Sequence, residues 1–214
     1  MKKYLWIFFI ILIIGVGIFA FGNLNNEEEN YTAERTTSNI SNKINSIQQG
    51  LTNQMLNLNK EQKEEKIAEF ITKLPNDTEA RDDNIRLACK TLSGTVVKKN
   101  EEFSLWDTIG CPTKESGYEK AKSFTSDGKV IQSYGGGICQ LSTTIYNAVL
   151  EVNGLKVTER HEHSRKVPYI EDGKDAAVSY GNSDLKFKNN LEYDVRIDAK
   201  VENRKVKITL VRIP

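Results

Sequence analysis

The first 22 residues constrain this chain most, because they contain a long run without a charged side chain, from Tyr4 to Gly22. A helix over that run would be roughly 28 Å long at about 1.5 Å per residue, close to the hydrocarbon thickness of a bilayer. Lys2 and Lys3 precede the run and three glutamates follow at 27–29. A positive flank stays in the cytoplasm, so the pattern predicts a transmembrane signal anchor over 1–22 with the rest of the chain extracytoplasmic.

A cleaved signal peptide is the competing interpretation of the same segment. Its apolar region normally has about 7–15 residues and ends at a small-x-small cleavage site. Here the apolar run is longer, and Ile18 to Gly22 offers no such site. The uncleaved anchor is therefore the better prediction.

The charge balance bears on binding partners, and the cysteine count bears on disulfides. Thirty lysines and arginines face 29 aspartates and glutamates, so no basic surplus argues for binding nucleic acid. Three cysteines are an odd number, which leaves at least one thiol without an intramolecular disulfide partner.

Residues 23–77 are predicted to form a polar tether and a helical stalk. The stretch 23–37 is rich in Asn, Glu and Thr and has little to bury. Apolar residues then recur at steps of three and four, close to a heptad, and Pro75 ends the pattern. This spacing leaves oligomerisation through the stalk open. The recurring residues are Ile40, Ile44, Ile47, Leu51, Met55, Leu58, Ile67, Phe70, Ile71 and Leu74.

Residues 78–214 are predicted to form one α+β domain, with short helices followed by an antiparallel β-rich half. Helical periodicity appears near 85–92 and near 139–152, where Gly94 and Gly154 act as stops. Alternating segments separated by turns then predict strands. These segments are 155–159, 161–167, 176–180, 185–188, 195–201 and 206–213.

The segment Gly135-Gly136-Gly137-Ile138-Cys139-Gln140 is the strongest candidate for chemistry. Glycines at Gly136 and Gly137 let the backbone bend sharply and approach a ligand. Cys139 would then open a helix, where the dipole and unpaired N–H groups favour a thiolate. The N–H groups of Cys139 and Gln140 could receive an oxyanion. The alternative is a buried cysteine at a glycine-rich helix start.

Two histidines are candidate bases for Cys139. The chain holds only His161 and His163, and in a strand both would point to the same face. A cysteine with a histidine base is a known nucleophilic pair, and Asp175 or Asp184 could orient the ring. The alternative is that both histidines are ordinary surface residues.

A zinc site is the rival use of these residues, because Cys139, His161 and His163 could form a Cys-His-His triad with one position open. The anion-binding features around Cys139 favour the free thiolate, so no metal and no other cofactor is expected. Cys89 lies on an apolar helix face, which favours burial. A disulfide between Cys111 and either Cys139 or Cys89 stays open.

Several motifs together resemble the VanW family, over about residues 84–214. They are Asn84-Ile85-Arg86-Leu87-Ala88, Glu102-Phe103-Ser104, Gly117-Tyr118, Gly136-Gly137-Ile138-Cys139-Gln140-Leu141-Ser142-Thr143-Thr144, Glu159-Arg160-His161-Glu162-His163-Ser164, Asp175-Ala176, Val178-Ser179-Tyr180-Gly181 and Asp184-Leu185-Lys186-Phe187-Lys188-Asn189. The family is named for an accessory protein of vancomycin-resistance clusters, and some members are credited with L,D-transpeptidase activity.

The resemblance implies a membrane-anchored cell-wall enzyme that forms 3→3 peptidoglycan cross-links, with stem peptides as partners. Cys139 would carry the acyl group, and His161 or His163 would be the base. The matching motifs also imply substrate contacts from Arg160, Ser164, Arg165, Tyr180 and Asp184. Family members often have Gly-Pro-Arg-Thr where this chain has Gly110-Cys111-Pro112-Thr113. That departure keeps two alternatives open, a non-catalytic peptidoglycan-binding or glycopeptide-resistance accessory module and a thiol peptidase or carboxypeptidase acting on stem peptides.

Overall fold

The computed structural model describes residues 27–61, 64–124 and 128–214. Contacts divide the chain into two units, Met1–Leu58 and Asn59–Pro214, and the second of these is the compact unit. The anchor expected over residues 1–22 lies outside the described residues. Among the residues that are described, no helix combines the length and the apolar character needed to cross a bilayer.

Helix α2 (Glu27–Glu61) confirms the helical periodicity expected between Ile40 and Leu58. It begins at Glu27, so the prediction of a flexible tether over 23–37 is wrong for its helical part. Four members of the apolar stripe are exposed, and pairing of this stripe with a second copy stays a prediction. They are Ile40, Ile47, Leu51 and Met55.

The expected continuation of the stalk helix over Ile67–Leu74 is wrong, because β1 (Glu65–Lys73) is a strand. It pairs antiparallel with β9 (Lys205–Ile213) from Glu65 to Lys73. Ala68, Thr72 and Leu74 are buried at alternate positions, which is strand periodicity. The compact unit therefore begins before the boundary expected at residue 78.

A four-stranded antiparallel sheet in the order β1-β9-β8-β2 forms one side of the compact unit. Its other strands are β2 (Thr95–Val97) and β8 (Asp194–Glu202). β8 and β9 form a hairpin through Asn203 and Arg204, which have φ values of 49° and 54°. Two-residue hairpin turns of this kind need positive φ at both positions, and asparagine is among the residues that tolerate it.

Two smaller antiparallel sheets complete the strand arrangement. The first has the order β3-β7-β6, and the second pairs β4 with β5. Their bounds are β3 (Glu102–Ser104), β4 (Lys120–Phe124), β5 (Val130–Tyr134), β6 (Leu155–Glu159) and β7 (Lys186–Asn189).

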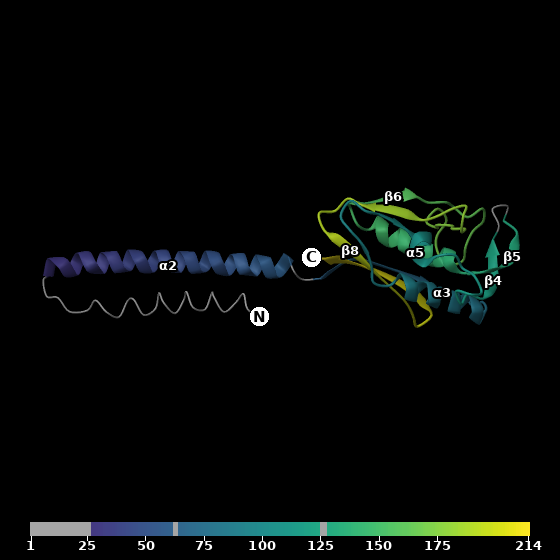
Figure 1. The fold of residues 1–214 in the computed structure, drawn as a ribbon, viewed down its shortest axis with the longest axis horizontal. Coiled ribbons are helices and arrows are strands. Elements are labelled where there is room, and N and C mark those ends of the chain that lie inside the picture. The colour runs from purple at the N-terminus through teal and green to yellow at the C-terminus, as the bar shows by residue number, and fades with distance from the viewer. Residues whose placement is uncertain (1–26, 62–63, 125–127) are drawn as a thin grey trace. The chain divides into compact units, whose positions relative to one another are not determined.

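Helix α5 (Ile138–Leu150) runs through the middle of the compact unit, between the four-stranded sheet and β6 (Figure 1). Helix α3 (Glu79–Leu92) packs against α5 and β8, and α4 (Leu105–Ile109) is a single short turn. The core residues come from these helices and from the sheets, which confirms the α+β class. The largest fully buried side chains include Ile85, Leu92, Leu141, Ile145, Phe187, Ile197, Ile208 and Leu210.

Most of the strands expected in the C-terminal half are present, but the one expected over 161–167 is not. His161 makes a single antiparallel bridge to Ala177, and 162–167 has no strand pairing. The strand expected over 176–180 is likewise reduced to isolated bridges, at Ala177 and Ser179. Both segments are loops that pass over the start of α5, which matters for the site.

Candidate functional site

Cys139 is the second residue of α5, directly after the glycine turn, as the sequence predicts. Gly137 caps the helix with φ 111°, a left-handed conformation that L side chains rarely adopt. A Cβ on Gly136 would come 2.6 Å from the carbonyl oxygen of Ala121 in β4. The two glycines therefore allow the start of α5 to lie directly against the neighbouring backbone.

The surroundings of Cys139 suit a reactive thiol more than a core residue. Its side chain is partly exposed, and the thiol donates to the Val178 carbonyl over 3.4 Å. Within the described part of the chain, the Cys139 N–H has no hydrogen-bond acceptor. The Gln140 N–H, in contrast, donates to the Gly137 carbonyl at 2.9 Å. The expected oxyanion donor is therefore free at Cys139 and occupied at Gln140.

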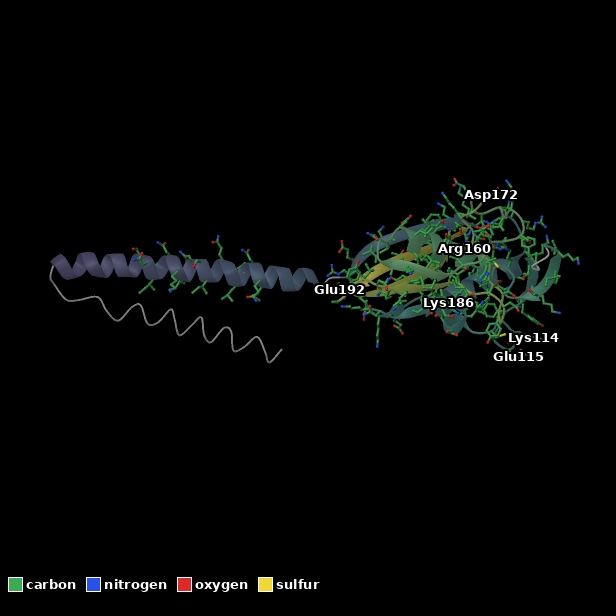
Figure 2. The ribbon with its side chains drawn as sticks, turned by 90° about the horizontal axis from the view of Figure 1, so that it is seen from above. Lys114, Glu115, Arg160, Asp172, Lys186 and Glu192 are labelled. Carbon is green, nitrogen blue, oxygen red and sulfur yellow. The ribbon has the colours of Figure 1, made fainter. Side chains whose placement is uncertain are left out.

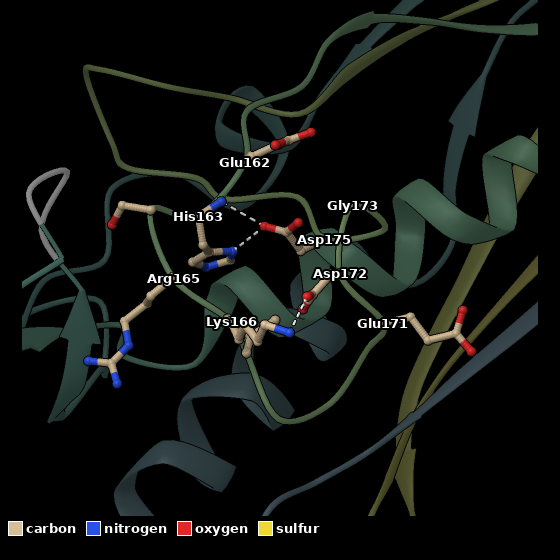
Figure 3. A pocket seen from close by; sticks show the side chains of 10 residues that line it. Glu162, His163, Arg165, Lys166, Glu171, Asp172, Gly173 and Asp175 are labelled. Carbon is tan, nitrogen blue, oxygen red and sulfur yellow. Dashed lines mark hydrogen bonds and ion pairs between the residues drawn. The ribbon is translucent and has the colours of Figure 1, made fainter.

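His163 is the histidine that lies beside Cys139. Its side chain is 5% exposed, and Nδ1 lies 2.6 Å from Asp175 Oδ2, which also accepts the His163 backbone N–H at 2.7 Å (Figure 3). Because Nδ1 faces the carboxylate, the hydrogen-bond pattern assigns the proton there and leaves Nε2 for the thiol. Burial lowers the pKa of His163, but its hydrogen bond and charge interaction with Cys139, and then with Asp175, outweigh this, so the pKa is raised.

Asp175 is held in place by contacts from three directions. Burial works to raise the pKa of Asp175, but hydrogen bonds from the His163 backbone and ring outweigh it, so the pKa is lowered. The carboxylate consequently stays ionised at neutral pH. Thr143 Oγ1 accepts the Ala176 N–H at 2.9 Å, and Asn147 Nδ2 donates to the Lys174 carbonyl at 2.8 Å. Helix α5 thus fixes the loop that carries Asp175.

Arg160, an expected substrate contact, supports Asp175. Its Nε donates to the Asp175 carbonyl at 2.7 Å, and one Nη lies 3.3 Å from Asp175 Oδ1. The guanidinium also lies over the Tyr146 ring, 5.1 Å from its centroid. Figure 2 shows Arg160 over the body of the compact unit and Asp172 at its rim.

His161 does not share a face with His163, because the segment between them is not a strand. Its ring is exposed and lies 3.0 Å from Glu159 Oε1. The Cys-His-His arrangement that a zinc ion would need is therefore not assembled. Among the described residues, no group of three or more metal-type side chains lies together.

The Gln140 side chain is structural, although the sequence placed this residue in the reactive loop. It is fully buried, and Nε2 donates to Thr72 Oγ1 and to the Lys73 carbonyl, each at 2.9 Å. Its Oε1 accepts from Arg81 Nη2 at 2.9 Å. Gln140 thereby connects α5 to β1 and α3, and so fixes the position of its neighbour Cys139.

The carboxylate of Asp184, which was expected at the substrate or beside a histidine, is hydrogen-bonded to the start of α4. It is buried and accepts from Ser104 Oγ at 2.5 Å and from the Trp106 N–H at 3.3 Å. Both donors belong to the start of α4, which Ser104 caps. Tyr180 is exposed and lies edge-on to Trp106, with ring centroids 5.7 Å apart.

Ser164 and Arg165 are exposed beside the β4–β5 hairpin. An added Cβ on Gly128 would come 3.2 Å from Ser164 Oγ, and the Arg165 guanidinium lies 4.9 Å from the Phe124 ring centroid. The Phe124 ring is in turn edge-on to His163, at 6.5 Å between centroids. These residues surround the approach to His163.

A pocket of about 220 Å³ lies beside the His163–Asp175 pair, and both residues are part of its lining (Figure 3). Cys139 is not part of its lining, so the pocket reaches the reactive centre only through the histidine. Lys166 and Asp172 form an ion pair across it at 2.5 Å. The lining residues are Glu162, His163, Ser164, Arg165, Lys166, Val167, Glu171, Asp172, Gly173 and Asp175.

Two residues at Cys139 were missed by sequence reasoning, Arg81 and Tyr169. Arg81 lies in an acidic, polar helix start that reads as surface, yet only 6% of it is exposed. Burial raises the pKa of Tyr169, and the nearby Cys139 raises it further. A hydrogen bond with Thr143 works in the opposite direction but does not offset these two effects. Neither residue has a local pattern that marks it, because both reach the site through long-range packing.

The chain is similar in sequence to known proteins over most of the residues that form the site. Residues 80–211 match the sequence pattern of the family described as VanW like protein. The chain is 36% identical over 146 residues to the uncharacterized protein YoaR of Bacillus subtilis (strain 168), covering 68% of this chain and 48% of that one. It is 30% identical over 128 residues to the vancomycin B-type resistance protein VanW of Enterococcus faecalis (strain ATCC 700802 / V583), covering 58% and 46%. The chain thus spans about half the length of these curated relatives. No solved structure matches.

Proposed function

The chain belongs to the VanW family, and on that premise we propose that it is a cell-wall protein whose compact unit is a cysteine-dependent L,D-transpeptidase. The observation that carries the proposal is the alignment of Cys139, His163 and Asp175 at the start of α5. A nucleophile beside a base that a third group orients is the general arrangement of covalent acyl transfer. The vancomycin-resistance name of the Enterococcus relative agrees with a role in the cell wall.

The first half of the reaction forms an acyl-enzyme. The Cys139 proton passes to His163 Nε2, and Sγ attacks the carbonyl before the terminal D-alanine of a stem tetrapeptide. A C–S bond forms, and the oxyanion accepts a hydrogen bond from the Cys139 N–H, which has no acceptor among the described residues. His163 then gives its proton to the amide nitrogen as the C–N bond breaks, and D-alanine leaves.

The second half transfers the acyl group to an amine of a neighbouring stem. The amine attacks the thioester carbon and gives a proton to His163, and the C–S bond breaks to restore Cys139. Asp175 keeps the ring in one orientation and stabilises its charged form, which both halves need. The product is a 3→3 cross-link.

A hydrolase is the second candidate, because Cys139 is partly exposed and water could replace the amine. The two candidates share the acyl-enzyme and differ only in the acceptor. A non-catalytic accessory module is the third candidate. It is the least favoured, because it gives no role to the arrangement of Cys139 and His163.

Incubation of the purified protein with tetrapeptide muropeptides, with products measured by mass, separates these candidates. Transfer predicts dimers with loss of D-alanine, hydrolysis predicts shortened monomers, and unchanged muropeptides contradict both enzymes. Cys139→Ala should abolish the products. His163→Ala should lower turnover by about 10²–10⁴-fold, as expected for loss of a general acid–base.

His161→Ala is the matched control, because it removes the same side chain two residues away from an exposed position. It should leave turnover unchanged. Equal losses in the two histidine variants would contradict the assignment of His163 as the base.

The expected anchor over residues 1–22 would place this chemistry on the outer face of the cell membrane, where stem peptides lie. Protease added to intact protoplasts should then remove the compact unit. Protection of the unit in intact protoplasts would contradict that location.

A further inference from the structure

Arg81 is a buried guanidinium with one unused hydrogen-bonding group. It lies in the first turn of α3, only 6% of the residue is exposed, and Nη1 has no hydrogen-bond partner in the described part of the chain. Buried donors in native proteins are almost always paired, so an exception calls for an explanation such as a ligand. A charged donor is the most costly kind to leave unpaired.

The other nitrogens of Arg81 place the guanidinium against the start of α5. Nη2 donates to Gln140 Oε1 at 2.9 Å, and Nε lies 3.9 Å from Asp77 Oδ2. A Cβ on Gly137 would come 3.0 Å from Arg81 Cγ, so the side chain crosses the glycine that precedes Cys139 by two residues. Glycine at 137 therefore makes room for Arg81 as well as for the turn.

The charge of Arg81 reaches the reactive thiol. Burial lowers the pKa of Arg81, and negative charge on Tyr169, Asp77, Asp82 and Cys139 works against that lowering. An arginine remains protonated at any physiological pH, so the site keeps a positive charge.

Neither neighbouring carboxylate satisfies Nη1. Asp77 lies at the long distance of 3.9 Å from Arg81 Nε and is also 3.8 Å from Lys122 Nζ. Asp82 points to Arg204, whose Nη1 donates to it at 3.2 Å. The site thus has an anion-binding group beside the nucleophile and no anion of its own on that nitrogen.

We propose that Arg81 binds the free carboxylate of the substrate residue on the leaving side of the bond that Cys139 attacks. This inference rests on the proposed function and names the substrate feature that it recognises. Guanidinium is the side chain best suited to carboxylate, through charge-assisted hydrogen bonds. In a tetrapeptide stem the D-alanine carboxylate is separated from the scissile amide nitrogen by one carbon, so it must lie near Cys139 during attack.

The proposal has one consequence for the choice of donor and one for access to Arg81. The donor must end one residue after the scissile bond, because a longer chain or an amidated end presents no carboxylate at Arg81. The carboxylate can reach the buried Nη1 only if a neighbouring side chain shifts. Tyr169 places its ring 6.0 Å from the Arg81 Cζ, so it is the neighbour whose shift would open this approach.

Alkylation of Cys139 by iodoacetate and by iodoacetamide, measured by peptide mass, tests the site without turnover. The two reagents differ by one carboxylate, and the ratio of their rates reports anion attraction at the thiol. Arg81→Gln should lower the iodoacetate-to-iodoacetamide ratio about tenfold, as expected for loss of one hydrogen bond to a charged group. An unchanged ratio in Arg81→Gln overturns the proposal.

Arg86→Gln is the matched control, since it removes the same charge from an exposed position on the same helix. It should leave the ratio at Cys139 unchanged. The exposed Cys111 in the same sample reports any general change of surface charge. An equal fall in both arginine variants means that only net charge matters, and it overturns the proposal.

A wild-type measurement keeps the test valid if Arg81→Gln does not fold. D-Alanine should slow the alkylation of Cys139 by iodoacetamide, whereas D-alaninamide should not. Equal protection by the two compounds, or protection by neither, overturns the proposal.

Failure of the Arg81 proposal can be distinguished from failure of the proposed function. Cross-links formed equally well from tetrapeptide acid and tetrapeptide amide would retain the transpeptidase and overturn the carboxylate site. Loss of all turnover would overturn the transpeptidase, while the alkylation ratio would still report whether Arg81 attracts a carboxylate.

Discussion

His163 and Asp175 show how single side chains decide which of two neighbouring histidines serves the thiol. Asp175 Oδ2 accepts both the backbone N–H and the ring Nδ1 of His163, so one carboxylate oxygen fixes the chain and the ring together. Residues 162–167 form no strand, and the His161 ring lies beside Glu159 instead. The two histidines therefore differ, because the His163 side chain is buried beside Asp175 and the His161 side chain is exposed.

Asp175→Asn should lower the pKa of His163, because it removes a charge and a hydrogen bond that raise it. The folded-state pKa lies above the unfolded value of 6.5, so the pairing adds stability below pH 6.5 that is lost as pH rises through the folded value. The melting temperature should therefore drop more on substitution at about pH 6 than at about pH 9.

Titration of the ring signals by NMR measures the first effect directly, and with only two histidines His161→Ala identifies each signal. A His163 pKa that is unchanged or higher in Asp175→Asn would contradict the assigned contact. A melting deficit that grows as pH rises would contradict the sign of the linkage.

Cys89 provides an internal reference at the same scale. Burial raises the pKa of Cys89 to about 12, so this thiol should stay unreactive wherever Cys139 is alkylated. All three cysteines are free, so neither disulfide left open by the sequence is present.

At the scale of elements, α5 and β1 form one structural group through Gln140. The Gln140 amide donates to Thr72 and Lys73 at the end of β1, and Thr72 Oγ1 lies 2.8 Å from Thr144 Oγ1. β1 also pairs with β9 along its length. The strand therefore supports both the sheet and the helix that carries Cys139.

Removal of β1 should consequently destabilise the compact unit. A fragment of residues 59–214 should melt cooperatively, whereas a fragment of 78–214 should show a broad or absent transition and exposed apolar surface. Calorimetry of both fragments measures this, with Gln140→Ala in 59–214 as an intermediate case. A cooperative melt of 78–214 at the same temperature would contradict the role given to β1.

Sequence patterns predicted the helices and strands whose buried positions hold strongly apolar residues. They gave the wrong element where the buried positions hold small or polar residues. Helix α5 and strands β8 and β9 were expected within a few residues of their bounds. In β1 and the residue after it, the buried positions are Ala68, Thr72 and Leu74, and Ile71 is exposed. The strongly apolar residues there happen to fall at helical spacing, so the short run was read with the wrong period.

The candidate site was predictable only where its signal is local. Cys139 and the glycine turn are local, because a helix start after glycines is visible in the sequence. The selection of His163 over His161 and the burial of Arg81 and Asp184 depend on packing between distant segments. No spacing rule along the chain reports such contacts.

At the scale of the whole molecule, the site combines a rigid helix with loops. α5 lies between two sheets and holds Cys139, while the loops over its start supply His163, Asp175 and Tyr169. Catalytic groups commonly lie on loops that a rigid scaffold positions. In this chain the scaffold acts through Thr143 and Asn147, which bind the loop carrying Asp175.

The most direct test of the central claim is the intact mass of the protein after incubation with a tetrapeptide muropeptide whose free amines are acetylated. The donor can then acylate Cys139 but cannot serve as acceptor. We predict a mass increase equal to the donor minus D-alanine, located on the Cys139 peptide, retained in Cys111→Ala and absent in Cys139→Ala. Release of D-alanine without an adduct on Cys139, or an adduct that persists in Cys139→Ala, would contradict the account.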